Sequence, residues 1–250
     1  MTVGGGLRRW FGHLLVVVLC VGFVNLGFWQ LRRAEERQLE NQVLASRFEA
    51  EARPVEELVL GAAADVDSLR LRRAFARGEF QPQHEILVRS QVHEGAAGFH
   101  VVTPLLLDEG TALLVNRGWV PLQFDQVPSP VSPPTGEVLV EGWLELSQPS
   151  TADDSDPHMV RTVDIAQMQA AVPWRLQPVY LVDESGGGEG LPAPLHPPDL
   201  NDPGPHLIYA WQWFAFALIG VVGYGFLLRR ARPKPRSVTR QGGGPDPQPP

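Results

Sequence analysis

The chain has 250 residues and a formal net charge of −7, so its length suggests one or two domains. A nucleic-acid-binding protein needs a basic face, and the acidic excess of this chain argues against nucleic acid as a partner. The one cysteine, Cys20, excludes a disulfide, a CxxC copper site, a zinc cluster and a CxxCH haem attachment within the chain.

Two long apolar runs lie at residues 10–29 and 207–228. Each has roughly the ~20 residues that a helix needs to cross a hydrocarbon core of about 30 Å. A backbone in lipid must satisfy its own hydrogen bonds, so both runs are expected to be helical. The first run has two other interpretations. A signal peptide is one, but the bulky end of the run at Phe28 and Trp29 does not resemble a cleavage site. A buried core helix is the second, and the length of the run argues against it. We therefore predict two transmembrane helices.

The charges around these runs predict the orientation of the chain. Residues 30–206 carry 27 of the 28 acidic residues, whereas Arg8 and Arg9 precede the first run and Arg229 and Arg230 follow the second. Basic residues close to the membrane favour the cytoplasmic side. We predict a cell-membrane protein with a cytoplasmic N-terminus (1–9), helix 1 (10–29), an extracytoplasmic domain (30–206), helix 2 (207–228) and a disordered cytoplasmic tail (229–250).

The first part of the domain is predicted to be helical. Apolar residues recur at roughly helical spacing after Gln30, so the first helix should continue out of the membrane until Pro54 ends it. Residues 62–77 are predicted to form another helix, with two acidic residues near the start and Gly78 at the end.

The rest of the domain is predicted to be mainly extended. Strands are expected at residues 85–89, 99–107, 111–116, 137–146 and 178–182, with a turn at Asp108-Glu109-Gly110 and a short helix at 164–171 capped by Asp164. Residues 184–205 are rich in glycine and proline and are predicted to form a mobile tether. The predicted fold class is an α+β membrane protein, in which two transmembrane helices flank an antiparallel β-rich extracytoplasmic domain.

Four segments resemble a known family in sequence and in order: LGFWQLRR at 26–33, GFHVVTPLLL at 98–107, LLVNRGWVP at 113–121 and HLIYAWQWF at 206–214. They are similar to the Surfeit-locus (SURF-one/Shy) family of cytochrome c oxidase assembly proteins, with Asn-Arg-Gly-Trp-Val-Pro as the most specific piece. The resemblance spans the chain from the first helix to the second. It implies a membrane-bound assembly factor, or chaperone, for haem-copper cytochrome c oxidase, with oxidase subunits and the haem a delivery machinery as partners.

Some bacterial members of that family are thought to handle haem a, and the resemblance assigns this role to His206. A neutral imidazole at the outer end of the second helix can ligate haem iron, and Trp213 is spaced to share its face. Gln30 could hydrogen-bond across the helix pair, and Arg32 or Arg33 could hold a haem propionate. The alternatives are an interfacial histidine that faces water beside an aromatic belt, and lipid headgroup contacts for Gln30 and Arg33.

The motif Asn116-Arg117-Gly118-Trp119 is predicted to be structural. Arg117 would pair with a loop carboxylate, Gly118 would permit a bulge or a positive φ, and Trp119 would pack. The alternative is a direct contact with the oxidase.

The sequence contains no recognisable catalytic constellation, so we expect a protein that is not an enzyme. Two other functions remain open, namely a cofactor-free membrane scaffold and a membrane-anchored extracytoplasmic enzyme such as a peptidase or thiol oxidoreductase. A missing nucleophile and a missing cysteine pair count against the enzyme.

Overall fold

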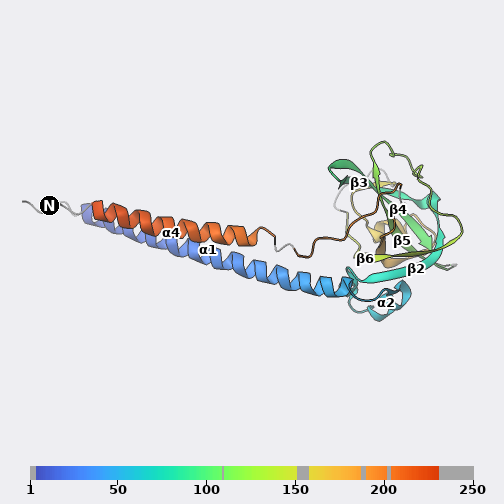
Figure 1. Ribbon diagram of the computed structural model, residues 1–250, viewed down its shortest axis with the longest axis horizontal. Helices are drawn as coiled ribbons and strands as arrows, with labels where there is room; N and C mark the ends of the chain where they lie inside the picture. Colours follow the sequence, from blue (N-terminus) through green and yellow to red (C-terminus); the bar gives the residue numbers. More distant parts are fainter. Residues whose placement is uncertain (1–3, 109, 151–157, 187–189, 202–203, 231–250) are drawn as a thin grey trace, which may run out of the picture. The chain divides into compact units, whose positions relative to one another are not determined.

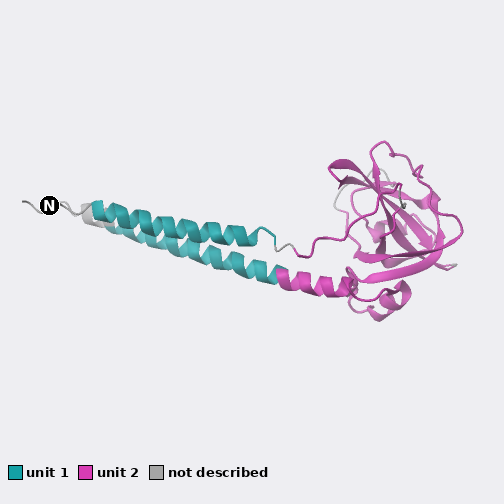
Figure 2. Cartoon of the chain, in the orientation of Figure 1, with its two compact units in different colours: residues 1–37, 203–250 teal, residues 38–202 magenta. Residues whose placement is uncertain are grey.

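The computed structural model describes residues 4–108, 110–150, 158–186, 190–201 and 204–230. Most of the predicted tail, residues 231–250, lies outside this range. The chain divides into two compact units, one of residues 1–37 with 203–250 and the other of residues 38–202 (Figure 2).

The first unit contains the N-terminal part of helix α1 (Gly4–Phe48) and helix α4 (His206–Arg230), which lie side by side (Figure 1). Both helices are long and apolar enough to cross a membrane, and this is a membrane protein. Ala210 and Ala217 are buried between the helices, while most large apolar side chains of the pair face outward, as lipid-facing residues do. Gly27 allows the closest approach, because a Cβ there would lie 2.5 Å from Cε1 of Phe214.

Aromatic side chains fill the rest of this helix interface. Phe23 on α1 stacks on Trp213 of α4, with ring centroids 5.7 Å apart. Phe28 meets Phe214 edge to face at 5.4 Å. Such arrangements are the favourable geometries for aromatic pairs. The helix α1 continues beyond the apolar run, as predicted, but it ends at Phe48 rather than just before Pro54.

The second unit is built on one sheet with the strand order β1-β2-β6-β8-β5-β4-β3-β7 among the described residues. A further pairing between β2 and β4 closes β2, β6, β8, β5 and β4 into a barrel (Figure 1). The strands are β1 (Arg53–Pro54), β2 (Arg73–Phe80), β3 (Ile86–His93), β4 (Ala96–Leu106), β5 (Thr111–Pro121), β6 (Glu137–Leu146), β7 (Met159–Val160) and β8 (Arg175–Asp183). Short helices α2 (Val55–Gly61), η1 (Val66–Leu69), η2 (Pro82–His84) and α3 (Ile165–Gln169) connect them.

Strand β5 is buried on both faces, which explains its nearly continuous apolar sequence. Leu113 and Val115 belong to the cluster inside the barrel, together with residues of β2, β4, β6 and β8. Leu114 points the other way, into a second cluster that also contains Met168 of α3 and Leu44 from the end of α1. The most specific stretch of the sequence is therefore the central strand of the domain.

The predicted fold class is confirmed, since two apolar helices flank a β-rich domain whose strands pair mostly antiparallel. The structure adds three parallel pairs, β1–β2, β3–β7 and β5–β8. The β5–β8 pair joins strands that are far apart in the sequence, and no hairpin signal marks such a pair.

The predicted helix at residues 62–77 is wrong. Its first half contains only the 3-10 turn η1, and its second half enters strand β2. Alanine, leucine and arginine favour helices in isolation. Here the side chains of Ala74 and Ala76 both point into the barrel, and the two residues pair with Gly142 and Val140 of β6. Burial in the sheet therefore outweighs the local helical propensity.

Candidate functional site

His206 and Gln30 lie together in the helix pair. Nδ1 of His206, the first residue of α4, is 3.0 Å from Oε1 of Gln30 on α1. Both side chains are partly buried. The predicted hydrogen bond between Gln30 and the second helix is therefore present, and it is made to the histidine itself.

This bond selects one form of the imidazole. A carboxamide oxygen only accepts hydrogen bonds, so Nδ1 of His206 donates and carries the proton. Nε2 of the neutral ring then keeps its lone pair, as a metal-ligating histidine requires. Gly204 lies beside that edge with a φ of +73°, and a Cβ there would be 4.0 Å from Nε2. The glycine thus keeps side-chain atoms away from the nitrogen that could ligate.

Trp213 and Arg33 are engaged with other residues. Trp213 is two helical turns along α4 from His206, about 10 Å, and packs against Phe23 and Phe216. Arg33 lies on the surface of α1, where Nη1 donates to Oε2 of Glu36 at 2.9 Å. Such an exposed pair contributes little stability, so it leaves the guanidinium available to another anion.

A second polar contact links α1 and α4 nearer their other ends. The hydroxyl of Tyr224 hydrogen-bonds Nδ1 of His13, and the two rings meet edge to face. His13 and Gln30 are separated by about 26 Å of helix, close to the thickness of a hydrocarbon core. Polar groups inside apolar helices are costly in lipid unless paired. The two contacts therefore fix the register of the helices at both edges of the apolar span.

Arg117 in the β-domain forms a buried ion pair. Its side chain is 5% exposed, and Nη1 donates to Oε2 of the fully buried Glu85 at 3.2 Å. Its Nη2 donates to the carbonyl of Val131 at 3.0 Å. Glu85 lies between η2 and β3, one residue before the strand that was predicted to begin with it, so the partner of Arg117 is a carboxylate in a connection.

Further hydrogen bonds make the burial of this pair possible. Glu85 Oε2 also accepts from the Thr103 hydroxyl at 2.8 Å, and Oε1 accepts from the backbone N–H of Ser129 at 2.6 Å. Burial raises the pKa of the Glu85 carboxyl, and the bonds from Ser129, Thr103 and Arg117 oppose that rise. The cluster joins β3, β4, β5 and the segment before β6, so its role is to hold the barrel wall in place.

Asn116, Gly118 and Trp119 organise the surface next to this pair. The Asn116 amide donates to Nδ1 of His100 at 3.3 Å, and its carbonyl accepts from the Gly118 N–H at 3.2 Å. Gly118 has a φ of +127°, and a Cβ there would collide with the carbonyl of Ala193. Trp119 and Ala193 exchange two backbone hydrogen bonds of 2.8 and 2.7 Å.

The prediction of a mobile tether at 184–205 is wrong for its described central part. The bonds between Trp119 and Ala193 fasten this segment to β5, and Leu195 and Leu200 pack on the core. His196 then stacks on His93, which itself stacks on Trp119. The motif is thus structural in its contacts, because it attaches the chain that leads toward α4.

Comparison with known proteins places the chain in a family. The model of the SURF1 family matches residues 17–218, which include most of α1, the whole barrel and the first half of α4. The chain belongs to the SURF1 family. It is 31% identical over 230 residues to an uncharacterised SURF1-like protein of Mycobacterium bovis, covering 87% of this chain and 82% of the relative. A SURF1-like protein of Rickettsia bellii is 28% identical over 220 residues, covering 84% and 88%.

Sequence reasoning about this SURF1 protein missed several residues that the site depends on. Glu85 and Tyr224 carry no local signal, because each acquires its partner from a distant part of the chain. Gly204, two residues before His206, is the one local hint, since glycine is the residue that accepts positive φ. Among the described residues, no group of three or more His, Cys, Asp or Glu side chains is arranged to hold a metal ion.

Proposed function

We propose that this SURF1 protein is a non-enzymatic, membrane-bound assembly factor for haem-copper cytochrome c oxidase, and that it binds haem a through His206. The family is linked to oxidase assembly, and the family model matches most of this chain. The observation that carries the haem proposal is the hydrogen bond from His206 Nδ1 to Gln30 Oε1, because it leaves Nε2 as the ligating nitrogen.

The residues around His206 fit such a group. The imidazole sits at the first residue of an apolar helix, where an iron-bearing macrocycle can lie against apolar and aromatic side chains. Tyr209 and Trp211 near the start of α4 are exposed and offer such surface. Arg33 could pair with a haem propionate if its guanidinium released Glu36. When bound, haem a would supply an iron that accepts the His206 nitrogen, and the protein would bind and orient the group for transfer.

The proposal includes an orientation in the membrane. Both termini would lie in the cytoplasm, since Arg229 and Arg230 end α4 and arginine favours that side. The barrel and the His206 end of the helix pair would then lie on the extracytoplasmic side. There the protein would meet the oxidase subunits and the machinery that delivers haem a.

The test is the absorption spectrum of the full-length protein, purified from membranes of cells that make haem a. We expect a haem a spectrum for the unchanged protein and its loss in His206→Ala at unchanged abundance in the membrane. His158→Ala, at an exposed histidine of the domain, is the matched control and should keep the spectrum.

Two results would reject the haem role. Normal haem content in the His206 variant would exclude this residue as the ligand. A protein that never carries haem, but whose deletion still lowers oxidase activity, would leave a cofactor-free scaffold as the function. In contrast, loss of haem together with loss of oxidase activity in His206→Ala would support delivery.

A further inference from the structure

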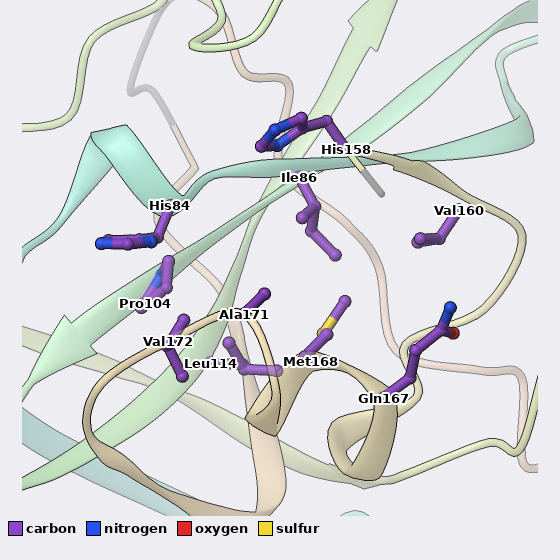
Figure 3. Close-up of a pocket in the computed structure, with 10 residues that line it drawn as sticks. All are labelled: His84, Ile86, Pro104, Leu114, His158, Val160, Gln167, Met168, Ala171 and Val172. Atoms are coloured by element: carbon purple, nitrogen blue, oxygen red, sulfur yellow. The ribbon is translucent and has the colours of Figure 1, made fainter. Parts of the chain in front are cut away.

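The β-domain contains a cavity that is separate from the helix pair. Its volume is about 300 Å³, and it lies between the sheet and helix α3. It is lined by residues of η2, of the four strands β3, β4, β5 and β7, and of the chain around α3 (Figure 3): His84, Ile86, Pro104, Leu114, His158, Val160, Gln167, Met168, Ala171 and Val172. The close-up shows Ile86 and Met168 pointing toward one another across it.

The walls of the cavity are held in place by hydrogen bonds. Asp164 caps α3 by accepting from the N–H groups of Ala166 and Gln167, and Ser147 accepts from the N–H of Ile165. After the helix, the side chain of Gln169 donates to the carbonyl of Trp174 and accepts from the N–H of Leu176. The cavity is therefore preformed, which is the usual condition of a small-molecule site.

The position of one rim residue is also fixed. The ring of His84 meets Trp174 edge to face, with centroids 5.2 Å apart. Trp174 in turn is positioned by the bond from Gln169. The His84 imidazole is thus oriented by packing and keeps its nitrogens for other partners.

The lining has a definite chemistry. None of the ten lining residues is an acid, an arginine or a lysine, so a charged ligand would lose its hydration without compensation. Ile86, Leu114 and Met168 provide an apolar body. His84, His158 and Gln167 add polar groups that can donate or accept a hydrogen bond (Figure 3). This combination of an apolar interior and a few polar groups is typical of sites for small uncharged molecules.

We propose that this cavity binds an uncharged aromatic compound with one hydrogen-bonding oxygen, its ring against Met168 and its oxygen at His84. The volume corresponds to about ten water molecules, which is the size of a molecule with one or two rings. Methionine is suited to such a wall, since its flexible, polarisable side chain makes favourable contacts with ring edges. The proposal does not depend on haem binding at His206.

The test uses the methionine methyl groups of the full-length protein in detergent. The chain has three methionines, and Met168 lines the cavity while Met159 on β7 does not. With ¹³C-labelled methionine methyls, 1-naphthol should shift the Met168 signal in a saturable manner and leave Met159 in place. The charged naphthalene-1-sulfonate should shift neither signal, and Met168→Leu assigns the resonance.

Two sets of variants test the roles of the residues. His84→Phe should weaken the binding of 1-naphthol several-fold, down to the affinity of naphthalene, which lacks the oxygen. Ala171→Phe places a ring in the cavity from an exposed position and should abolish the shift, with the unchanged Met159 signal showing that the fold is kept. Val92→Phe, at an exposed position of β3 outside the cavity, is the control and should bind normally.

The proposal fails if 1-naphthol leaves Met168 unshifted or shifts it without saturation. It also fails if the sulfonate binds equally well, or if His84→Phe does not change the preference for 1-naphthol over naphthalene. If Ala171→Phe disturbs the fold, the His84 variant still decides the outcome. His206→Ala should leave the Met168 response unchanged, so failure of the haem proposal can be recognised separately.

Discussion

Gln30 and His206 are 176 positions apart in the chain and share a hydrogen bond of 3.0 Å between Oε1 and Nδ1. The bond engages Nδ1 of His206 as the donor and leaves Nε2, on the other edge of the ring, outside the contact. Gln30 is therefore a positioning residue, whose effect on a ligand passes through His206.

The first prediction is that Gln30→Leu weakens haem a binding by about 10- to 100-fold without abolishing it, as changes to the partner of a ligating histidine do. The expected reason is that Nδ1 loses its acceptor, so the tautomer and the ring orientation are no longer fixed. Haem titration of the purified protein measures this. Gln30→Glu keeps an acceptor and should restore most of the affinity. Equal affinity for Gln30→Leu and the unchanged protein would remove Gln30 from the site.

The second prediction concerns the buried pair of Arg117 and Glu85. Removing either partner leaves the other charge buried without a partner. Arg117→Ala or Glu85→Ala should therefore each lower the free energy of unfolding by about 3–5 kcal/mol. The exposed pair of Arg53 and Glu57 is the matched control, and Arg53→Ala should cost no more than about 1 kcal/mol. Denaturant unfolding followed by tryptophan fluorescence measures these changes.

The double substitution of Arg117→Met with Glu85→Leu should cost less than the sum of the two single alanine changes, since no charge is left unpaired. Strict additivity would mean that the two side chains do not act as a unit. Because the defect is one of folding, oxidase activity should fall in proportion to the amount of protein in the membrane.

The third prediction separates two roles of Gly118. Alanine at a left-handed position costs about 1–2 kcal/mol by itself, and Gly95→Ala measures that cost because Gly95 has a φ of +83° with open space around it. Gly118→Ala should cost more, because its Cβ also meets the carbonyl of Ala193. It should in addition release the segment around Ala193, which limited proteolysis would detect. If both substitutions lowered the free energy of unfolding equally, the contact with Ala193 would contribute nothing to stability.

The fourth prediction is a loss of stability on acidification. Burial, with a smaller contribution from His93, lowers the pKa of His100 from 6.5 to about 4. The unfolded chain then binds a proton before the folded protein does, so stability is present above pH 6.5 and falls as the pH drops toward 4. The loss at this residue amounts to about 3 kcal/mol at most.

Unfolding curves between pH 7 and 4 should therefore be less pH-dependent for His100→Gln than for the unchanged protein. An identical slope for His100→Gln and the unchanged protein would contradict the assignment.

The fifth prediction concerns the orientation in the membrane. In a Cys20→Ser background, a cysteine introduced at Leu60, which is 80% exposed on the β-domain, should react in intact cells with a maleimide that cannot cross the inner membrane. A cysteine at Ser237 in the C-terminal tail should react only after the membrane is opened. The reverse pattern would overturn the orientation.

The sequence alone determined the features that depend on local or averaged properties. The two apolar runs predict α1 and α4, because crossing lipid demands a helix of a certain length whatever the partner. Asp164 is the cap of α3, as predicted, because a cap is set by neighbours in the chain. The strands β5 and β6 were recognised for the same reason, from apolar patterning within a few residues.

Only the tertiary structure decided which distant residues meet. Residues 73–77 are a strand because β6 is there to pair with, although their own propensity is helical. The glycine- and proline-rich segment around Ala193 is fixed because Gly118 leaves room for it on β5. Likewise, the partners of His206 and Arg117 come from elsewhere in the chain, since a hydrogen bond between distant residues depends on packing that no local pattern encodes.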